Sequence, residues 1–430
     1  MNTETRIAPS ANPAISGGGF WFTGGNGGNK EKGLAPFSPS PPVKTNPSEA
    51  ELAAWPQRLF TIDTHCDTPT VSLARTDWDF AAKHDRESDR SQCDLPRMAA
   101  GGLDAMVFAV YSTQAARTPA GYAAVHAEAL RAFARTREVL RENANRCALA
   151  QNAADGLRLK AEGRRAIYLS IENSYSLGRE LGNVAKFHQL GVRMLGLTHM
   201  LNNDLADSST DPRGPEWGGL SPFGRDVVAE CNRLGILLDA SHASDQALRD
   251  LLASSATPVI LSHSGCRAVC DHPRNIGDDL LRALAAQGGV IQINALPVAV
   301  VAAPEDGRTA ALSAMLLKLA DAVLTPAVLA EAGKEWHRIE ATYPNPRATL
   351  DDFVKHVEHA VAVAGIDHVG IGCDFDGGGG VTGLNDVSEY PNLPAALLAR
   401  GWSDDHLAKL WGGNTLRIFR AAETAASQSR

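Results

Sequence analysis

Six of the eight β-strands predicted from this sequence end on a residue that can bind a metal ion or move a proton. Short β-branched runs alternate with helical patterns from Leu59 onward, which is typical of repeated βα units and a parallel sheet. The six strands with reactive ends are 60–67, 166–172, 194–199, 236–242, 259–263 and 369–374, and the other two are 104–110 and 290–294. Parallel strands of a closed α/β barrel end around one mouth, so residues about 300 positions apart can meet there. The sequence therefore predicts an α/β fold, a (β/α)8 TIM-type barrel of the metal-dependent hydrolase type.

Two helices in this alternation have recognisable ends. Ser221 and Pro222 supply an N-cap and a first-turn proline to a helical stripe that stops before Gly235. Thr349 caps a second helix, which Gly365 closes, so the last barrel strand follows directly. The stretch from about 300 to 348 is expected to be helix plus irregular loop and has no assigned role.

Composition favours a single large domain and argues against nucleic acid as a partner. A chain of 430 residues with 44% hydrophobic content can bury one core. Residues 1–50 are rich in Gly, Pro, Ser and Asn and are predicted to be an arm, disordered or packed on a neighbour. Residues 51–430 are predicted to be the single catalytic barrel domain. The net charge of −8 and the lack of a Lys/Arg cluster favour a small-molecule partner.

The cysteines and the N-terminal segment indicate in which cellular compartment the protein is expected. The seven cysteines are mostly far apart and include no CxxC pair, which predicts reduced, buried thiols. The sequence shows no basic segment followed by an apolar one near its start, and no apolar run of about 18 residues. We expect a cytoplasmic protein without a membrane segment, with the periplasm as the alternative.

Histidines and carboxylates at the strand ends predict a metal centre. His65 and Asp67 are two positions apart, so their side chains share one face and can bind one ion. Glu172, His242 and His263 at other strand ends complete the ligands of two zinc ions, with Glu172 bridging them. A lone HxD pair is weak support, but a chance alignment of all five residues is improbable.

Other functional classes fit the sequence less well. No GxSxG elbow is present, and Cys66 between two ligands is poorly placed to work with a free base, which disfavours nucleophilic catalysis. A metal-dependent nuclease on such a barrel usually carries HxH on the first strand, and the acidic charge opposes a polyanionic substrate. A barrel that binds a ligand or partner without catalysis is a further hypothesis, which turnover would exclude.

Six segments carry a resemblance to a known family: IDTHCD at 62–67, GLSPFG at 219–224, LDASH at 238–242, LSHS at 261–264, RN at 274–275 and GCDFDG at 372–377. They resemble the membrane dipeptidase (renal dipeptidase) family of zinc metallopeptidases, in the amidohydrolase superfamily. The resemblance implies a homodimeric zinc dipeptidase that cleaves free dipeptides, including those with a D-residue at the C-terminus. Another binuclear-metal amidohydrolase, acting on N-acyl amino acids or lactams, is the alternative.

The resemblance also implies individual roles. It assigns His65 and Asp67 to one zinc ion, His242 and His263 to the other, and Glu172 to the bridge. His199 is similar to the substrate-binding histidine that polarises the scissile carbonyl and stabilises the oxyanion. Arg274 matches the arginine that binds the terminal carboxylate of the substrate, and Asp374 matches the acid/base group that contacts the substrate.

Overall fold

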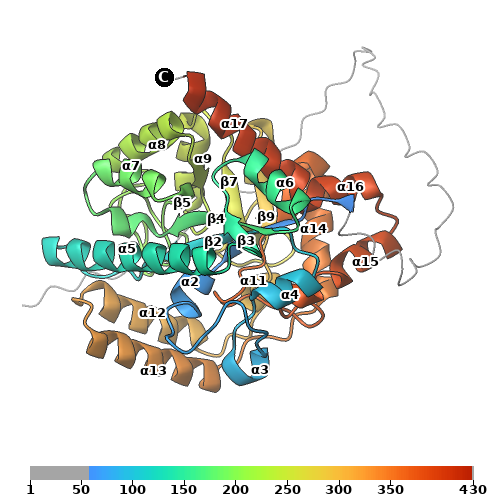
Figure 1. Ribbon diagram of the computed structural model, residues 1–430. Coiled ribbons are helices and arrows are strands. Elements are labelled where there is room, and N and C mark those ends of the chain that lie inside the picture. Colours follow the sequence, from blue (N-terminus) through green and yellow to red (C-terminus); the bar gives the residue numbers. More distant parts are fainter. Residues whose placement is uncertain (1–57, 429–430) are drawn as a thin grey trace, which may run out of the picture. The chain divides into compact units, whose positions relative to one another are not determined.

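The computed structural model describes residues 58–428, which form a nearly closed parallel β-barrel surrounded by helices (Figure 1). The barrel strands are β1 (Ile62–Cys66), β2 (Ala105–Tyr111), β4 (Arg165–Glu172), β5 (Val192–Gly196), β6 (Leu237–Asp239), β7 (Ile260–Cys266), β9 (Val290–Ile293) and β10 (Val369–Ile371). Neighbours in this order pair in parallel. Two short strands add to the sheet, β3 (Cys147–Leu149) beside β4 and β8 (Asn275–Ile276) beside β7. The predicted (β/α)8 fold is confirmed.

The helices lie outside the strands (Figure 1). Those of eight or more residues are α5 (Pro119–Glu142), α6 (Ala153–Ala161), α7 (Gly182–Gln189), α8 (Pro222–Leu234), α9 (Asp245–Ser254), α10 (Asp278–Ala286), α12 (Arg308–Ala320), α13 (Pro326–Thr342), α14 (Leu350–Ala364), α15 (Asn392–Ala399) and α17 (Asn414–Gln428). Shorter ones are α2 (Thr68–Val71), α3 (Arg86–Asp89), α4 (Leu95–Ala100), α11 (Pro297–Val300), α16 (Asp404–Ala408), η1 (Ser174–Leu177), η2 (Ile366–His368), η3 (Val387–Glu389) and η4 (Lys409–Gly413).

Both predicted helix starts are present. The Ser221 hydroxyl accepts a hydrogen bond from Gly224 N–H at 2.9 Å, and Gly235, with φ of 76°, caps the C-terminus of α8. Thr349 and Asp352 form a capping box at the start of α14. The stretch from 300 to 348 is helix plus loop, as expected. Its two long helices, α12 and α13, pack against each other at the lower edge of the view (Figure 1).

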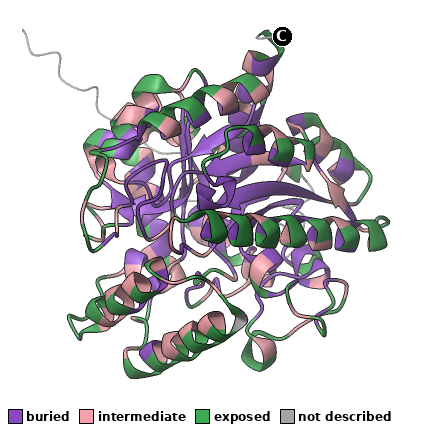
Figure 2. Cartoon of the chain, turned by 90° about the vertical axis from the view of Figure 1, so that its left-hand side faces the viewer, coloured by how far each residue is buried: buried purple, intermediate pink, exposed green. Residues whose placement is uncertain are grey.

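The barrel strands form the core of the molecule. Figure 2 shows them buried, while the outward faces of the helices are exposed. In β2, six successive residues from Ala105 to Val110 are buried. Parallel strands that are covered on both faces are expected to be apolar along their whole length. Buried polar residues gather instead at the carboxyl ends of the strands, where the candidate site lies.

The barrel closes between β1 and β10 with few backbone hydrogen bonds. A single bridge joins Cys66 to Phe375, and Asp67 N–H donates to Phe375 O at 3.0 Å. Two side chains of β1 add bonds across this seam. Thr64 Oγ1 donates to Ile371 O at 3.3 Å, and the carboxylate of Asp63, which is 1% exposed, accepts from Cys373 N–H.

Asp63 joins the two strands through Oδ2 and braces its own strand through Oδ1. Oδ2 accepts hydrogen bonds from Cys373 N–H at 2.8 Å and from the Tyr390 hydroxyl. Oδ1 accepts a hydrogen bond from His65 N–H at 2.9 Å. Because these bonds fix the backbone at His65 and at the residue before Asp374, barrel closure also sets the spacing of two predicted site residues.

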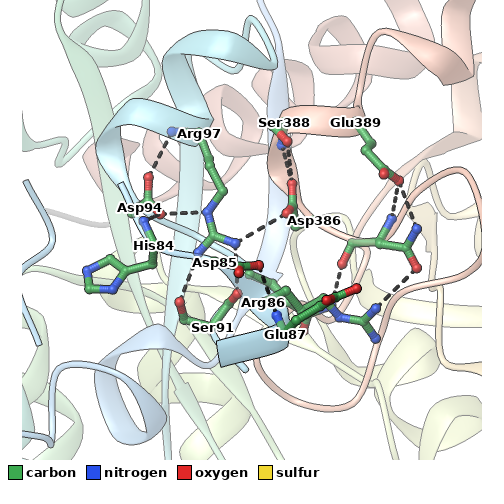
Figure 3. A network of polar contacts seen from close by, with 12 residues as sticks. His84, Asp85, Arg86, Glu87, Ser91, Asp94, Arg97, Asp386, Ser388 and Glu389 are labelled. Atoms are coloured by element: carbon green, nitrogen blue, oxygen red, sulfur yellow. Dashed lines mark hydrogen bonds and ion pairs between the residues drawn. The ribbon is translucent and has the colours of Figure 1, made fainter. Parts of the chain in front are cut away.

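A buried charge network braces α4 against η3 (Figure 3). Arg97 Nε donates to Asp94 Oδ2 at 2.5 Å, and these side chains are 2% and 0% exposed. Arg97 Nη1 also donates to Ser91 O at 2.8 Å and to Asp386 Oδ2 at 3.2 Å. A buried charge is costly unless it is paired and hydrogen-bonded, and these acceptors together offset the cost of burying the Arg97 guanidinium. The network ties residues 91–97 to the segment after the last barrel strand.

The remaining expectations concern thiols, the arm and membranes. All seven cysteines are buried and free, as predicted. The arm predicted at residues 1–50 lies outside the described residues. None of the helices in residues 58–428 combines the length and the apolar character that crossing a membrane requires.

Candidate metal centre

The five predicted metal ligands converge at the mouth of the barrel. His65 lies in β1, Glu172 ends β4 and His263 lies in β7. Asp67 directly follows β1, and His242 follows β6. The exposed fraction of each residue is between 1% and 6%. Residues from four strand ends therefore share one buried centre.

Glu172 lies in the middle of this centre and presents its two oxygens to different residues. Oε1 is 3.1 Å from His242 Nε2 and 3.4 Å from His263 Nε2. Oε2 is 3.3 Å from His65 Nε2, which is itself 3.5 Å from Asp67 Oδ2. A carboxylate whose oxygens face two separate sets of donors can bridge two cations.

The donor atoms of the centre suit cations. His65 Nε2 and Asp67 Oδ1 are buried and have no hydrogen-bond partner among residues 58–428. The Nε2 atoms of His242 and His263 are 2.9 Å apart, so at most one of them can carry a proton. A buried polar atom without a partner costs about 1–3 kcal/mol, which coordination to a metal ion would remove. Imidazole nitrogen and carboxylate oxygen are ligands that zinc accepts.

Burial and crowding shift the pKa values of the three carboxylates. Burial, reinforced by Glu172, raises the pKa of Asp67 to about 7. Burial also raises the pKa of Asp374 well above its ordinary value, and the charges of Asp67 and Glu172 add to this. Burial opposes ionisation of Glu172 as well, but the imidazoles of His65 and His199 outweigh it and hold the Glu172 pKa well below its usual range. Three carboxylates crowded in a buried centre require compensating positive charge.

His199 lies beside the ligands on the segment after β5. Its Nε2 is 3.8 Å from Glu172 Oε1, and its ring centroid is 4.1 Å from that of His242. Burial lowers the pKa of His199 to about 4, so its imidazole is neutral near pH 7. Tyr111 packs against it, with ring centroids 4.6 Å apart. Tyr111 is missing from the predicted site, although it directly follows the strand predicted at 104–110.

Asp374 reaches the centre from a strained turn after β10. Its Oδ1 is 3.9 Å from His65 Nε2. The φ angles of Asp374 and His242 are 63° and 67°, in the left-handed region that non-glycine residues rarely adopt. A Cβ atom at Gly377 would lie 2.1 Å from Asp67 Oδ2 and 2.3 Å from Asp374 Oδ1, so this position requires glycine. The sequence shows a run of four glycines at 377–380, but it does not show that Gly377 lies against two carboxylates.

Arg274 lies on the loop between β7 and β8 and is 6% exposed. Its Nη2 donates to His263 O at 3.2 Å, and its backbone N–H donates to His272 Nδ1 at 3.2 Å. Burial lowers the pKa of Arg274, and the charges of Asp374 and Glu172 partly offset that effect. No carboxylate of residues 58–428 forms an ion pair with its guanidinium within 4.0 Å. Such a group can receive a carboxylate through two parallel hydrogen bonds.

A TIM-type barrel with buried carboxylates and imidazoles at its carboxyl-end mouth defines a metal-dependent hydrolase. A model of the membrane dipeptidase family (peptidase family M19) matches residues 50–430, and the chain belongs to this family. It is 33% identical over 346 residues to the dipeptidase tcpJ of Claviceps purpurea (strain 20.1). The matched stretch covers 78% of this chain and 71% of that protein. The chain is therefore a metallopeptidase that hydrolyses peptide bonds.

Solved structures agree with the fold. The probable dipeptidase PvdM from Pseudomonas aeruginosa has a TM-score of 0.76 and 29% identity, covering 88% of this chain and 98% of that one. A metallopeptidase from Rhodobacter sphaeroides, bound to a phosphinate mimic of the dipeptide L-Ala-D-Ala, has a TM-score of 0.67 and 24% identity. That match covers 85% of this chain and 99% of that one, and it shows the fold alone.

Proposed function

We propose that this protein is a zinc-dependent dipeptidase that holds two Zn2+ ions through His65, Asp67, Glu172, His242 and His263. The observation that carries the proposal is that Glu172 faces His65 with one oxygen and both His242 and His263 with the other. His65 and Asp67 then serve one ion, and the other two histidines serve the second. Two zinc ions, when bound, supply a water that ionises near neutral pH and a Lewis acid for the scissile carbonyl.

Two further residues have roles in the reaction. We assign Asp374 to accept the proton of the attacking water and to deliver it to the leaving amine. The position of Asp374 beside the proposed ligands, with Oδ1 3.9 Å from His65 Nε2, supports this assignment, because the group must reach the attacking water. His199 is neutral, so its imidazole can donate an N–H to the carbonyl oxygen as negative charge develops there.

The substrate proposal depends on Arg274. A buried guanidinium beside the centre is suited to the free C-terminal carboxylate of a dipeptide. The same basic fold binds a mimic of L-Ala-D-Ala in the Rhodobacter sphaeroides protein, which supports including substrates with a D-residue at the C-terminus. The expected homodimer and the cytoplasmic location stay predictions.

A substrate panel tests the proposed function. The zinc-loaded protein is expected to hydrolyse free dipeptides of both L-Xaa-L-Xaa and L-Xaa-D-Xaa type and to lose this activity reversibly when a chelator removes the metal. Release of free amino acids is the measurement. Faster hydrolysis of N-acyl amino acids or lactams would replace the proposal with the alternative amidohydrolase class, and no turnover at all would favour a non-catalytic barrel.

Amidating the C-terminus of a good dipeptide is expected to lower kcat/KM about as much as Arg274→Ala does. Each change removes the same ion pair, worth about 1.5–3 kcal/mol, or roughly 10–150-fold. The two changes together should add little to either one. Arg267→Ala is the control, because Arg267 lies on the same loop but pairs with Asp245 at 2.7 Å and 2.8 Å. Equal cleavage of free and amidated dipeptides by the wild type would remove Arg274 from this role.

A further inference from the structure

The outer nitrogens of two proposed metal ligands meet at one buried hydroxyl. Ser262 Oγ lies 2.8 Å from His263 Nδ1 and 3.5 Å from His65 Nδ1. The same hydroxyl donates to Asp239 Oδ2 at 2.5 Å. Ser262 is 0% exposed and Asp239 is 4% exposed. Asp239 ends β6 and Ser262 lies in β7, so this contact joins two neighbouring barrel strands behind the metal centre.

The hydrogen bonds of this group define where its protons lie. Asp239 Oδ1 accepts the backbone N–H groups of Ser241 and Ser262, each at 2.9 Å, so Oδ2 is left for the Ser262 hydroxyl. A hydroxyl has one proton and two lone pairs, and Ser262 gives its proton to Asp239. Its Oγ can therefore only accept from His263, whose Nδ1 must carry the proton. The second lone pair faces Ser241 Oγ at 3.3 Å and His65 Nδ1 at 3.5 Å.

From this geometry we infer that Asp239 and Ser262 are positioning residues for the metal centre. They hold His263 in the tautomer with its proton on Nδ1, so that Nε2 presents a lone pair to the centre, and they orient His65 through the longer contact. The inference rests on the proposed function, because it concerns two ligands of the proposed zinc ions. Outer partners of this kind fix the ring orientation and raise the basicity of metal-binding histidines.

Ser262→Ala removes the hydroxyl while keeping both backbone hydrogen bonds of Asp239. We expect its dissociation constant for zinc to rise roughly 10–100-fold, the usual effect of losing such a partner. Ser264→Ala is the matched control: Ser264 lies on the same strand and is 1% exposed, and its Oγ has no hydrogen-bond partner among residues 58–428. The control should bind zinc like the wild type. Zinc affinity is measured by competition with a chromophoric chelator, and melting of the metal-free proteins confirms that they fold.

Asp239→Asn tests the direction of the proton chain. The amide oxygen would keep the two backbone N–H groups, so the amide nitrogen would donate to Ser262 Oγ. Ser262 would then turn its own proton toward His263 Nδ1, which moves the imidazole proton to Nε2, where it opposes metal binding. Two-bond 1H–15N spectra of metal-free protein with 15N-labelled histidine should show His263 protonated on Nδ1 in the wild type and on Nε2 in this variant.

The outcomes separate the positioning role of Asp239 and Ser262 from the proposed function. The positioning role is wrong if the metal-free wild type carries the His263 proton on Nε2, or if Ser262→Ala binds zinc as tightly as Ser264→Ala does. If Asp239→Asn fails to fold, those two results still decide the question. A wild type that binds fewer than two zinc ions or cleaves no dipeptide would instead contradict the proposed function, whereas the tautomer of His263 is read without metal.

Discussion

Glu172→Gln is expected to yield a folded protein that loses metal from both sites and at least roughly 10³-fold in kcat/KM, because the metal supplies several kcal/mol of transition-state stabilisation. Glu172 contributes the only charge shared by the two proposed ligand sets, with oxygens 3.1 Å from His242 and 3.3 Å from His65. Glutamine removes that charge and replaces one acceptor oxygen by an N–H donor that faces imidazole lone pairs. Metal content by elemental analysis and dipeptide hydrolysis are the two measurements.

The matched control for this substitution is Glu180→Gln. Glu180 is exposed and lies further along the same connection after β4, so neither metal content nor activity should change. Two equivalents of zinc in active Glu172→Gln would contradict the bridging role. Loss of a single equivalent would show that Glu172 serves one ion only.

Asp374→Asn is expected to keep both zinc ions and to bind dipeptide with a similar KM while kcat falls roughly 10²-fold or more, the scale of lost acid/base catalysis. Asparagine keeps the shape of the side chain and removes the proton that Asp374 is proposed to carry. Steady-state kinetics with parallel metal analysis is the measurement. Asp367→Asn, at the entry to β10, is the control, because Asp367 pairs with Lys409 on the surface at 2.7 Å.

Two outcomes would change the role of Asp374. A variant within a few-fold of wild-type kcat would assign the proton transfer to another group. A variant that loses metal would make Asp374 a ligand, which its grouping with His65 and Asp67 within 4.8 Å allows geometrically.

The fold could be predicted from local patterns because each βα unit repeats the same signal. Eight β-branched runs, with helical stripes between them, define parallel strands, and parallel strands of a closed barrel leave their carboxyl ends at one mouth. For this reason the neighbourhood of His65, Glu172, His242 and His263 follows from strand order alone. The arm at residues 1–50 lacks such a pattern, and its prediction stays untested.

The parts of the site that the sequence could not reveal depend on distances between segments. The strained φ angles at His242 and Asp374 and the glycine required at position 377 arise where loops meet over the barrel mouth. Tyr111 enters the site only because its ring packs on His199. No periodicity or spacing encodes such contacts, since they join residues from different βα units.

The type of fold, the ring of reactive residues and the resemblance to dipeptidases can be read from the sequence, because side-chain chemistry and periodicity are local properties of the chain. How the ring closes and how its members are held depends on contacts between distant segments. Asp63 closes the seam beside His65, and the Ser262 hydroxyl joins Asp239 to two ligand imidazoles. These are hydrogen bonds between buried groups. A change of a few tenths of an ångström in the donor–acceptor distance would weaken them, and the packing of the barrel sets that distance.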